Sequence, residues 1–313
     1  MTNILKDLFA DDTVRLIFMG SSVTDGYPYD ERVPKAYPIL MKELLENQFP
    51  NKKIQIENLA SCGEKTAYGL MTCEEKLMKY DAGIVFLDYA LNDKVSKDWM
   101  KMYEGMVRKI IRKGLVPVSM VLPGKDRSAA FRYIKKVSAY YKFPCICVDD
   151  LIAEIISKDN YCWEELYLDS THPNEKGHGL IAKLVTERFL GFLEEEENIS
   201  DTQFTKELLP GSYENMKIIK VVENDIFRKS FELECKTVWV SYKQHYEKSM
   251  GKLQVLVDGN LVENLHGRSH FSVDFSVQKK LFEFEYPEKH TITFQMAPGD
   301  EEKRFVLEMI GYC

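Results

Sequence analysis

Between Val14 and Leu193, short apolar runs alternate with longer segments in which apolar residues recur at the helical period. The runs Val14–Met19 and Gly83–Leu87 are rich in Val, Ile, Leu and Phe, which is typical of strands buried on both faces of a parallel sheet. Further strands are predicted at Lys53–Asn58, Leu115–Leu122 and Pro144–Val148, and helices at Tyr37–Asn47, Thr66–Lys79, Trp99–Lys113, Ala129–Tyr141, Leu151–Ser157 and Asn174–Leu193. The alternation predicts an α/β domain with a doubly wound parallel sheet and right-handed crossovers.

The pattern changes at the charge run Glu194–Asn198, which is typical of a solvated helix end or a linker. Beyond it, apolar and polar residues alternate with a period of two in short segments, separated by turns such as Asp258–Asn260 and Pro298–Asp300. The segments are Lys217–Val222, Ser230–Val240, Leu253–Val257, Phe271–Val277, Leu281–Phe284, Thr291–Gln295 and Phe305–Ile310. This pattern predicts an antiparallel β-sandwich. We therefore expect one domain over residues 1–200 and an all-β domain over residues 201–313.

A turn of small residues, Gly20–Gly26, follows the first predicted strand directly. In open parallel sheets, ligands bind beyond the carboxyl ends of the strands, where this turn is expected. Ser22 in the turn is therefore a candidate nucleophile. A serine after a strand is more commonly a turn or helix-capping residue, and for Ser22 alone that alternative stays open. The turn lacks the spacing and the lysine of a phosphate-binding loop.

The other strand ends carry the groups that an attacking serine needs. A base must take its proton. His172, just before the last helix, is the candidate base, and Asp169, three residues earlier in a predicted loop, would orient the imidazole. Donors to an oxyanion would be the backbone N–H of Gly63 and the side-chain amide of Asn92, each in the loop after a different strand. His178, inside the last helix, is instead predicted to be a surface or packing residue.

Each candidate also has a purely structural interpretation. Asp169 could cap the last helix, Asn92 could form an Asx turn, and Gly63 could relieve a tight turn. Several aromatic residues close to the two main blocks either line a pocket or belong to the core: Tyr27, Tyr29, Tyr161, Trp163 and Tyr167. A single short pattern of this kind is weak evidence for a catalytic site, because such patterns recur by chance. Four of them in order along the chain are specific evidence.

Together the four blocks resemble those of the SGNH, or GDSL-type, hydrolase family. The family's Gly-Asp-Ser, Asn-x-x-x-Ser-Gly-x-x-Thr, Gly-x-Asn-Asp and Asp-x-x-His-Pro blocks are similar to Gly20–Ser22, Asn58–Thr66, Ala90–Asp93 and Asp169–Pro173, respectively. Two departures from the family pattern matter: Ser21 stands in place of the usual Asp, and Ala90 in place of a Gly. Neither change removes a group that the reaction needs.

The resemblance covers roughly residues 12–193 and implies a flavodoxin-like three-layer α/β/α fold. It also implies a catalytic triad of Ser22, His172 and Asp169. The implied oxyanion hole consists of the Ser22 N–H, the Gly63 N–H and the Asn92 side chain. No metal or organic cofactor is expected in such a site.

Composition narrows the range of partners. The 313 residues carry a net charge of −7, and the acidic residues are spread along the chain, so we expect no nucleic-acid partner. No run approaches the roughly 18 apolar residues of a membrane-spanning helix. The N-terminus lacks the apolar core of a signal peptide, which favours a cytoplasmic protein. The seven cysteines have no metal-type spacing and favour free thiols.

These observations predict a serine esterase that cleaves short-chain acyl esters, above all acetyl esters, of small molecules or carbohydrates. The resemblance also extends to lysophospholipases and thioesterases, and a carbohydrate-binding or scaffolding protein that has lost activity is a further alternative. The appended β-domain is similar to the accessory domains of carbohydrate esterases, which favours acetylated sugars by analogy of fold. In that domain Trp239 alternates with Val238 and Val240, so we expect it to pack in the core rather than to form a sugar platform. The sequence does not predict an oligomeric state.

Overall fold

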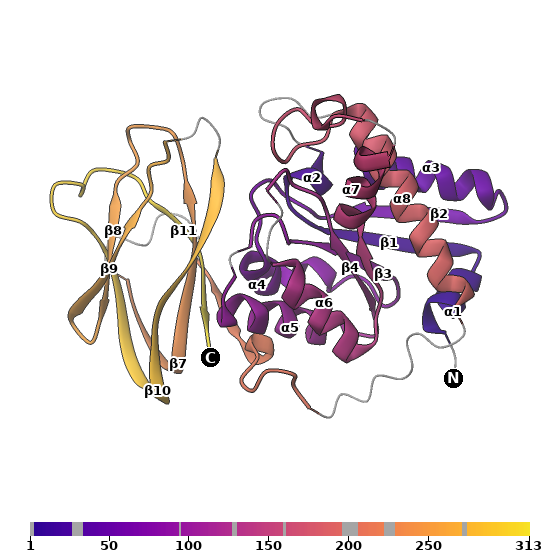
Figure 1. The fold of residues 1–313 in the computed structure, drawn as a ribbon. Helices are drawn as coiled ribbons and strands as arrows, with labels where there is room; N and C mark the ends of the chain where they lie inside the picture. The colour runs from indigo at the N-terminus through magenta and orange to yellow at the C-terminus, as the bar shows by residue number, and fades with distance from the viewer. Residues whose placement is uncertain are drawn as a thin grey trace. The chain divides into compact units, whose positions relative to one another are not determined.

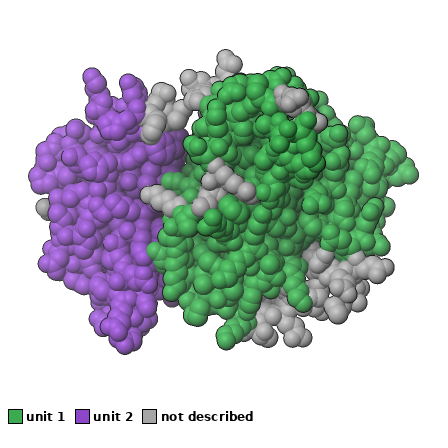
Figure 2. Space-filling view, viewed as in Figure 1, with its two compact units in different colours: residues 1–214 green, residues 215–313 purple. Residues whose placement is uncertain are grey.

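The chain divides into two units, residues 1–214 and residues 215–313 (Figure 2). The structure is a computed structural model, and it describes residues 3–26, 34–93, 95–126, 130–158, 161–195, 206–221, 229–270 and 274–313. The domain boundary predicted near residue 200 lies outside the described residues. Unit 1 contains a parallel sheet and unit 2 an antiparallel sheet (Figure 1).

Five parallel strands form the sheet of unit 1 in the order β2-β1-β3-β4-β5. They are β1 (Thr13–Gly20), β2 (Lys53–Asn58), β3 (Ile84–Asp88), β4 (Val116–Val121) and β5 (Cys145–Cys147). Every residue of β3 and β4 is buried, as the apolar pattern predicts for central strands. The direction in which strands are added reverses between β1 and β3, which makes the carboxyl ends of these two strands the expected ligand site.

Helices cover both faces of this sheet (Figure 1). They are α1 (Ile4–Ala10), α2 (Ser22–Asp25), α3 (Tyr37–Gln48), α4 (Thr66–Leu77), α5 (Lys97–Arg112), α6 (Phe131–Tyr141), α7 (Val148–Lys158) and α8 (Glu175–Glu194), with a 3-10 turn at Trp163–Glu165. Helices α4, α5 and α6 pack side by side on one face, and α1, α3 and α7 pack around α8 on the other. Alternate residues of a strand point to opposite faces, so Leu16 and Phe18 of β1 join the core beneath α3 and α8. The predicted three-layer α/β/α fold is confirmed.

Two segments of unit 1 differ from the sequence-based expectation. The sequence pattern does not predict helix α1, although Asn3 caps it and Leu5 and Phe9 enter the core. The segment 206–214 packs along α5, where the buried Glu104 accepts the backbone N–H groups of Leu208 and Leu209 at 2.5 and 3.0 Å. These contacts hold the segment 206–214, which follows the last helix α8, against unit 1.

Six strands form the antiparallel sheet of unit 2 in the order β6-β11-β7-β10-β8-β9. They are β6 (Lys217–Lys220), β7 (Lys229–Gln244), β8 (Lys252–Val257), β9 (Asn260–His266), β10 (Phe275–Met296) and β11 (Val306–Tyr312), preceded by a 3-10 turn at Tyr213–Asn215. Their inward side chains, among them Val238, Val255 and Phe294, form a second hydrophobic core. The predicted all-β class of this unit is confirmed.

Strand β10 is longer than the pattern predicts. The sequence indicates separate segments at Phe271–Val277, Leu281–Phe284 and Thr291–Gln295, of which residues 271–273 lie outside the described residues. The structure joins the remainder into one strand, whose register against β7 shifts between Glu283 and Glu288. Such an irregularity interrupts the period of two, which is why it is indistinguishable from a turn in the sequence.

No helix in the described ranges is long and apolar enough to cross a bilayer.

Candidate active site

Ser22 lies at the carboxyl end of β1, as the first residue of α2. Strand β1 can end beside β3 because Gly20 has no side chain: a Cβ there would lie 2.7 Å from the Asp88 carbonyl oxygen. Ser21 is the N-cap residue of α2 and makes no side-chain capping bond, and Gly26 ends the helix in the left-handed conformation with φ of 79°. Ser22 itself is therefore not the capping residue, and its hydroxyl has a different partner.

That partner is His172. The Ser22 Oγ lies 3.0 Å from His172 Nε2, and His172 Nδ1 lies 2.8 Å from Asp169 Oδ2. The carboxylate accepts a hydrogen bond from the Nδ1–H, which leaves the Nε2 lone pair to accept a hydrogen bond from the Ser22 hydroxyl. The side chains of His172 and Asp169 are 23% and 22% exposed. The structure thus brings together all three residues that the sequence predicts as a triad.

The loop before α8 holds Asp169 and His172 through its own hydrogen bonds. Asp169 Oδ1 accepts the backbone N–H groups of Thr171 and His172 at 2.6 and 2.7 Å. Trp163 stacks on the buried Tyr167 with ring centroids 3.8 Å apart, and its indole N–H donates to the Asp169 carbonyl at 2.6 Å. Two of the predicted aromatic residues therefore support this loop, whereas Tyr27 and Tyr29 lie outside the described residues.

The two predicted donor residues lie in neighbouring loops. Gly63 has φ of 75°, a conformation that favours glycine, in the turn after β2. That turn is joined to β1, because the N–H of Ser61 donates to the Gly20 carbonyl at 3.1 Å. Asn92, in the loop after β3, donates from Nδ2 to the Glu64 carbonyl at 3.1 Å. A side-chain amide has two N–H donors, and this bond uses one of them.

Behind Ser22 lies a buried polar network that sequence reasoning missed. Asp88, the last residue of β3, is fully buried, and its Oδ2 accepts the Thr24 hydroxyl at 2.7 Å. The Thr24 oxygen also lies 2.8 Å from the hydroxyl of Tyr37, which is the first residue of α3. Burial raises the pKa of Asp88 to about 7, although the hydrogen bond from Thr24 acts in the opposite direction. The network fixes α2, and with it Ser22, to β3 and α3.

A second buried carboxyl supports the loop that carries Asn92. Asp93 accepts the Thr66 N–H at 2.9 Å, the Thr66 hydroxyl and the Tyr133 hydroxyl. Burial raises the pKa of Asp93 to about 6, against the effect of these donors. The carboxyl joins this loop to the first turn of α4 and to α6.

His178 takes no part in the Ser22 chain. It is buried within α8, and its Nδ1 accepts the backbone N–H of Tyr37 at 3.2 Å. Burial, together with the nearby His172, lowers the pKa of His178 to about 4. A neutral, hydrogen-bonded core imidazole agrees with its prediction as a packing residue.

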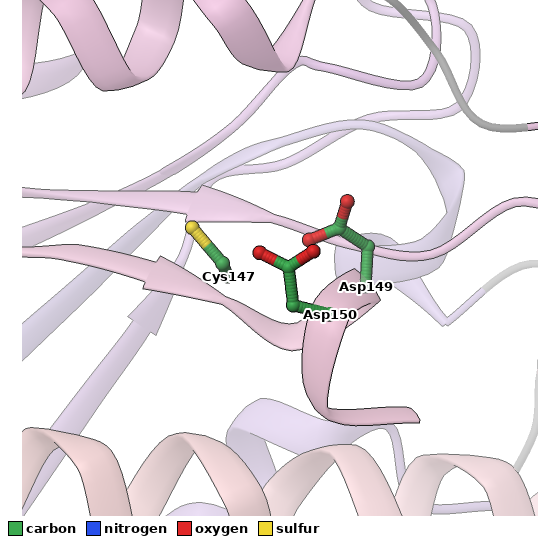
Figure 3. A group of neighbouring side chains, drawn as sticks. All are labelled: Cys147, Asp149 and Asp150. Atoms are coloured by element: carbon green, nitrogen blue, oxygen red, sulfur yellow. The ribbon is translucent and has the colours of Figure 1, made fainter. Parts of the chain in front are cut away.

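Cys147, Asp149 and Asp150 form a separate group at the end of β5 and the start of α7 (Figure 3). One ligand atom of each lies within 4.8 Å of the others. A cation is already present there, because Lys135 Nζ lies 3.0 Å from Asp150 Oδ2. The contact with Cys145, whose sulfur is 3.9 Å away, lowers the pKa of Cys147, and Lys135 acts in the same direction. All seven cysteines are free thiols, and nothing about this group requires a metal ion.

Comparison of the sequence with models of known protein families and with curated proteins finds no match. Comparison of the fold with solved structures, in contrast, finds matches. A two-domain esterase, CEX, active on acetylated mannans has a TM-score of 0.84 and 18% identity over 99% of this chain and 94% of that chain. A structure of such an esterase co-crystallised with mannopentaose has a TM-score of 0.82 and 19% identity over 99% and 92%. This chain has the two-domain fold of those esterases. At this identity the likeness establishes the fold alone, for the α/β unit and for the β unit.

Proposed function

We propose that this protein is a serine esterase that removes acetyl groups from carbohydrates. The observation that carries the proposal is the chain of hydrogen bonds from Ser22 through His172 to Asp169. A serine, an imidazole and a carboxylate in that order are the parts of a triad for acyl transfer, and their geometry here is within hydrogen-bond reach throughout. The sugar substrate is suggested by the fold shared with an esterase active on acetylated mannans.

In the first half-reaction, Ser22 Oγ attacks the ester carbonyl carbon while His172 Nε2 takes the hydroxyl proton. The carbonyl oxygen becomes an oxyanion, which accepts hydrogen bonds from the Ser22 N–H, the Gly63 N–H and the Asn92 amide. Asp169 holds the imidazole and stabilises its positive charge. When the C–O bond to the sugar breaks, His172 returns the proton to the departing sugar oxygen, and the acetyl group remains on Ser22.

In the second half-reaction, water replaces the sugar. His172 takes a proton from the water molecule, whose oxygen attacks the acetyl carbon, and the same donors hold the oxyanion. Collapse of this intermediate breaks the bond to Ser22 Oγ, which takes the proton back from His172. Acetate leaves, and the enzyme is regenerated with no net change in its own atoms.

The test compares acetate release from acetylated manno-oligosaccharides by wild type, Ser22→Ala and Ser21→Ala. Ser22→Ala should lose at least about a thousandfold in kcat, because it removes the nucleophile. Ser21→Ala is the matched control, since its side chain makes no capping bond, and it should stay within a few-fold of wild type. Equal turnover by wild type and folded Ser22→Ala would refute the nucleophile. Turnover of octanoyl but not acetyl esters would refute the substrate class.

A further inference from the structure

Unit 2 contains a pocket that is lined by none of the residues assigned to the reaction at Ser22. It lies where the start of β8, the end of β9 and the loop after β10 meet, and its volume is about 640 Å³. Sites for small molecules commonly have volumes of this order. Its polar lining consists of Lys252, Asn264, His266, Arg268, His270, Asp300 and Lys303.

The lining is strongly basic although the chain as a whole is acidic. Lys252 and His266 are register partners across β8 and β9, so their side chains share one face of the sheet. Among the described residues that line the pocket, Asp300 is the single carboxylate. It is already engaged, because Oδ1 lies 2.6 Å from Lys303 Nζ and Oδ2 accepts the Lys252 N–H at 2.9 Å. The pocket therefore retains an excess of positive charge.

Backbone contacts fix the shape of this pocket. Gly267 N–H donates to the Gly251 carbonyl at 2.9 Å, and Ala297 N–H donates to the Lys252 carbonyl at 2.9 Å. Gly251 is itself buried, and a Cβ there would lie 2.8 Å from the Lys303 Cβ. The walls are thus joined through main-chain groups and a close approach that glycine permits, so the basic side chains project from a preformed frame.

We propose that this pocket binds an acidic sugar, a hexuronate residue of an oligosaccharide, through its carboxylate. The guanidinium of Arg268 has the planar, two-pronged geometry that matches a carboxylate, and Lys252 adds a second cation. The volume exceeds what a single small anion fills, and Asn264 supplies donors and an acceptor for sugar hydroxyls. The described lining contains no Trp, Tyr or Phe ring against which a neutral sugar would stack. The choice of a sugar acid, rather than another carboxylate, rests on the proposed carbohydrate substrate.

The experiment is calorimetric titration of the full chain with tri-galacturonate, a neutral trisaccharide and inorganic phosphate at matched ionic strength. We expect saturable binding of tri-galacturonate that weakens as salt is added, with the two other probes binding at least tenfold more weakly. Arg268→Gln should weaken the binding about tenfold or more. Lys248→Gln, which changes an exposed lysine of the same unit outside the lining, should leave it unchanged.

Three results would overturn the proposal. Phosphate binding as tightly as the uronate would mean that the pocket recognises charge alone. A neutral trisaccharide binding equally well would remove the role of the carboxylate, and an unchanged affinity in Arg268→Gln would place binding elsewhere. The assay is independent of hydrolysis, because Ser22→Ala should bind tri-galacturonate as wild type does. Loss of esterase activity and loss of uronate binding are therefore separate outcomes.

Discussion

The Ser22 site has a carboxyl group on its solvent-facing side, Asp169, and another on its core-facing side, Asp88. The two differ in their exposure to solvent and in the groups that donate to them. Asp169 is partly exposed and accepts three N–H groups, two from the backbone and one from His172. Asp88 is fully buried and accepts the hydroxyl of Thr24. Several N–H donors favour the charged form of a carboxyl group, whereas burial favours the neutral form. The difference suits Asp169 to stabilise a cationic imidazole, whereas the raised pKa of Asp88 keeps the charge behind the nucleophile low below pH 7.

Removing the charge on the exposed side should have the largest effect. In Asp169→Asn an amide N–H can face His172 Nδ1, which favours the tautomer that carries its proton on Nε2. Nε2 then has no lone pair for the Ser22 hydroxyl. We expect kcat for acetyl ester hydrolysis to fall by about 10³ to 10⁴ with little change in KM.

Ser170→Ala is the matched control for this variant, because it changes an exposed side chain of the same loop while the backbone bond from Lys125 to residue 170 remains. Its kcat should stay close to that of wild type. A folded Asp169→Asn enzyme that kept more than a tenth of wild-type kcat would show that this carboxylate does not act on the imidazole.

Removing the ionisable group on the buried side should change stability rather than chemistry. The pKa of Asp88 is raised from 3.8 to about 7 in the fold, so between these values the folded state binds more protons than the unfolded state. Stability contributed by this group is therefore greatest at low pH and declines as the pH rises toward 7. Asp88→Asn removes the ionisation and keeps an oxygen acceptor for Thr24. Its advantage over wild type should grow with pH, to on the order of 4 kcal/mol above pH 7.

Urea unfolding between pH 5 and 8 measures this difference. Asp93→Asn is the comparison, since Asp93 is also buried but has its pKa raised only to about 6. For each variant, the difference from wild type in the free energy of unfolding should rise with pH and then become constant. For Asp93→Asn it should become constant about one pH unit lower than for Asp88→Asn. A constant difference in the free energy of unfolding between wild type and Asp88→Asn across this range would contradict the raised pKa of Asp88.

The two sides of the site also differ in how far the sequence predicts them. Ser22 follows β1 directly, at the edge of the sheet where ligands bind. Asp169 and His172 lie in the loop between α7 and α8, and it is the resemblance of the four blocks to one hydrolase family that proposes them as neighbours of Ser22. The buried side carries no such signal. Thr24 is indistinguishable from a turn residue, and only the position of α3 brings Tyr37 to it. A burial-dependent pKa such as that of Asp88 follows from tertiary packing, which local patterns do not contain.

In unit 2, too, the sequence predicts the class of fold but not the contacts that depend on strand pairing. Its period of two predicts strands and an antiparallel class, but the register of β8 against β9 is needed to bring Lys252 beside His266. The bulged register of β10 is likewise absent from the pattern, because polar residues inside a strand resemble a turn. The basic pocket could therefore be found only once the strands were paired.

The smallest effect is predicted for the exposed side of the site, where one hydrogen bond of Trp163 can be removed while its ring stays stacked on Tyr167. Trp163→Phe keeps an aromatic ring on Tyr167 but deletes the indole N–H that donates to the Asp169 carbonyl. The loss of this bond should cost about 1 kcal/mol, seen as a drop of about fivefold in kcat/KM if the loop positions His172.

Tyr167→Phe is the counterpart, because the buried Tyr167 hydroxyl has no hydrogen-bond partner among the described residues. It should leave kcat/KM unchanged and raise the midpoint of thermal unfolding slightly. If both variants lower kcat/KM equally, the stack of rings holds the loop and the indole bond to Asp169 does not.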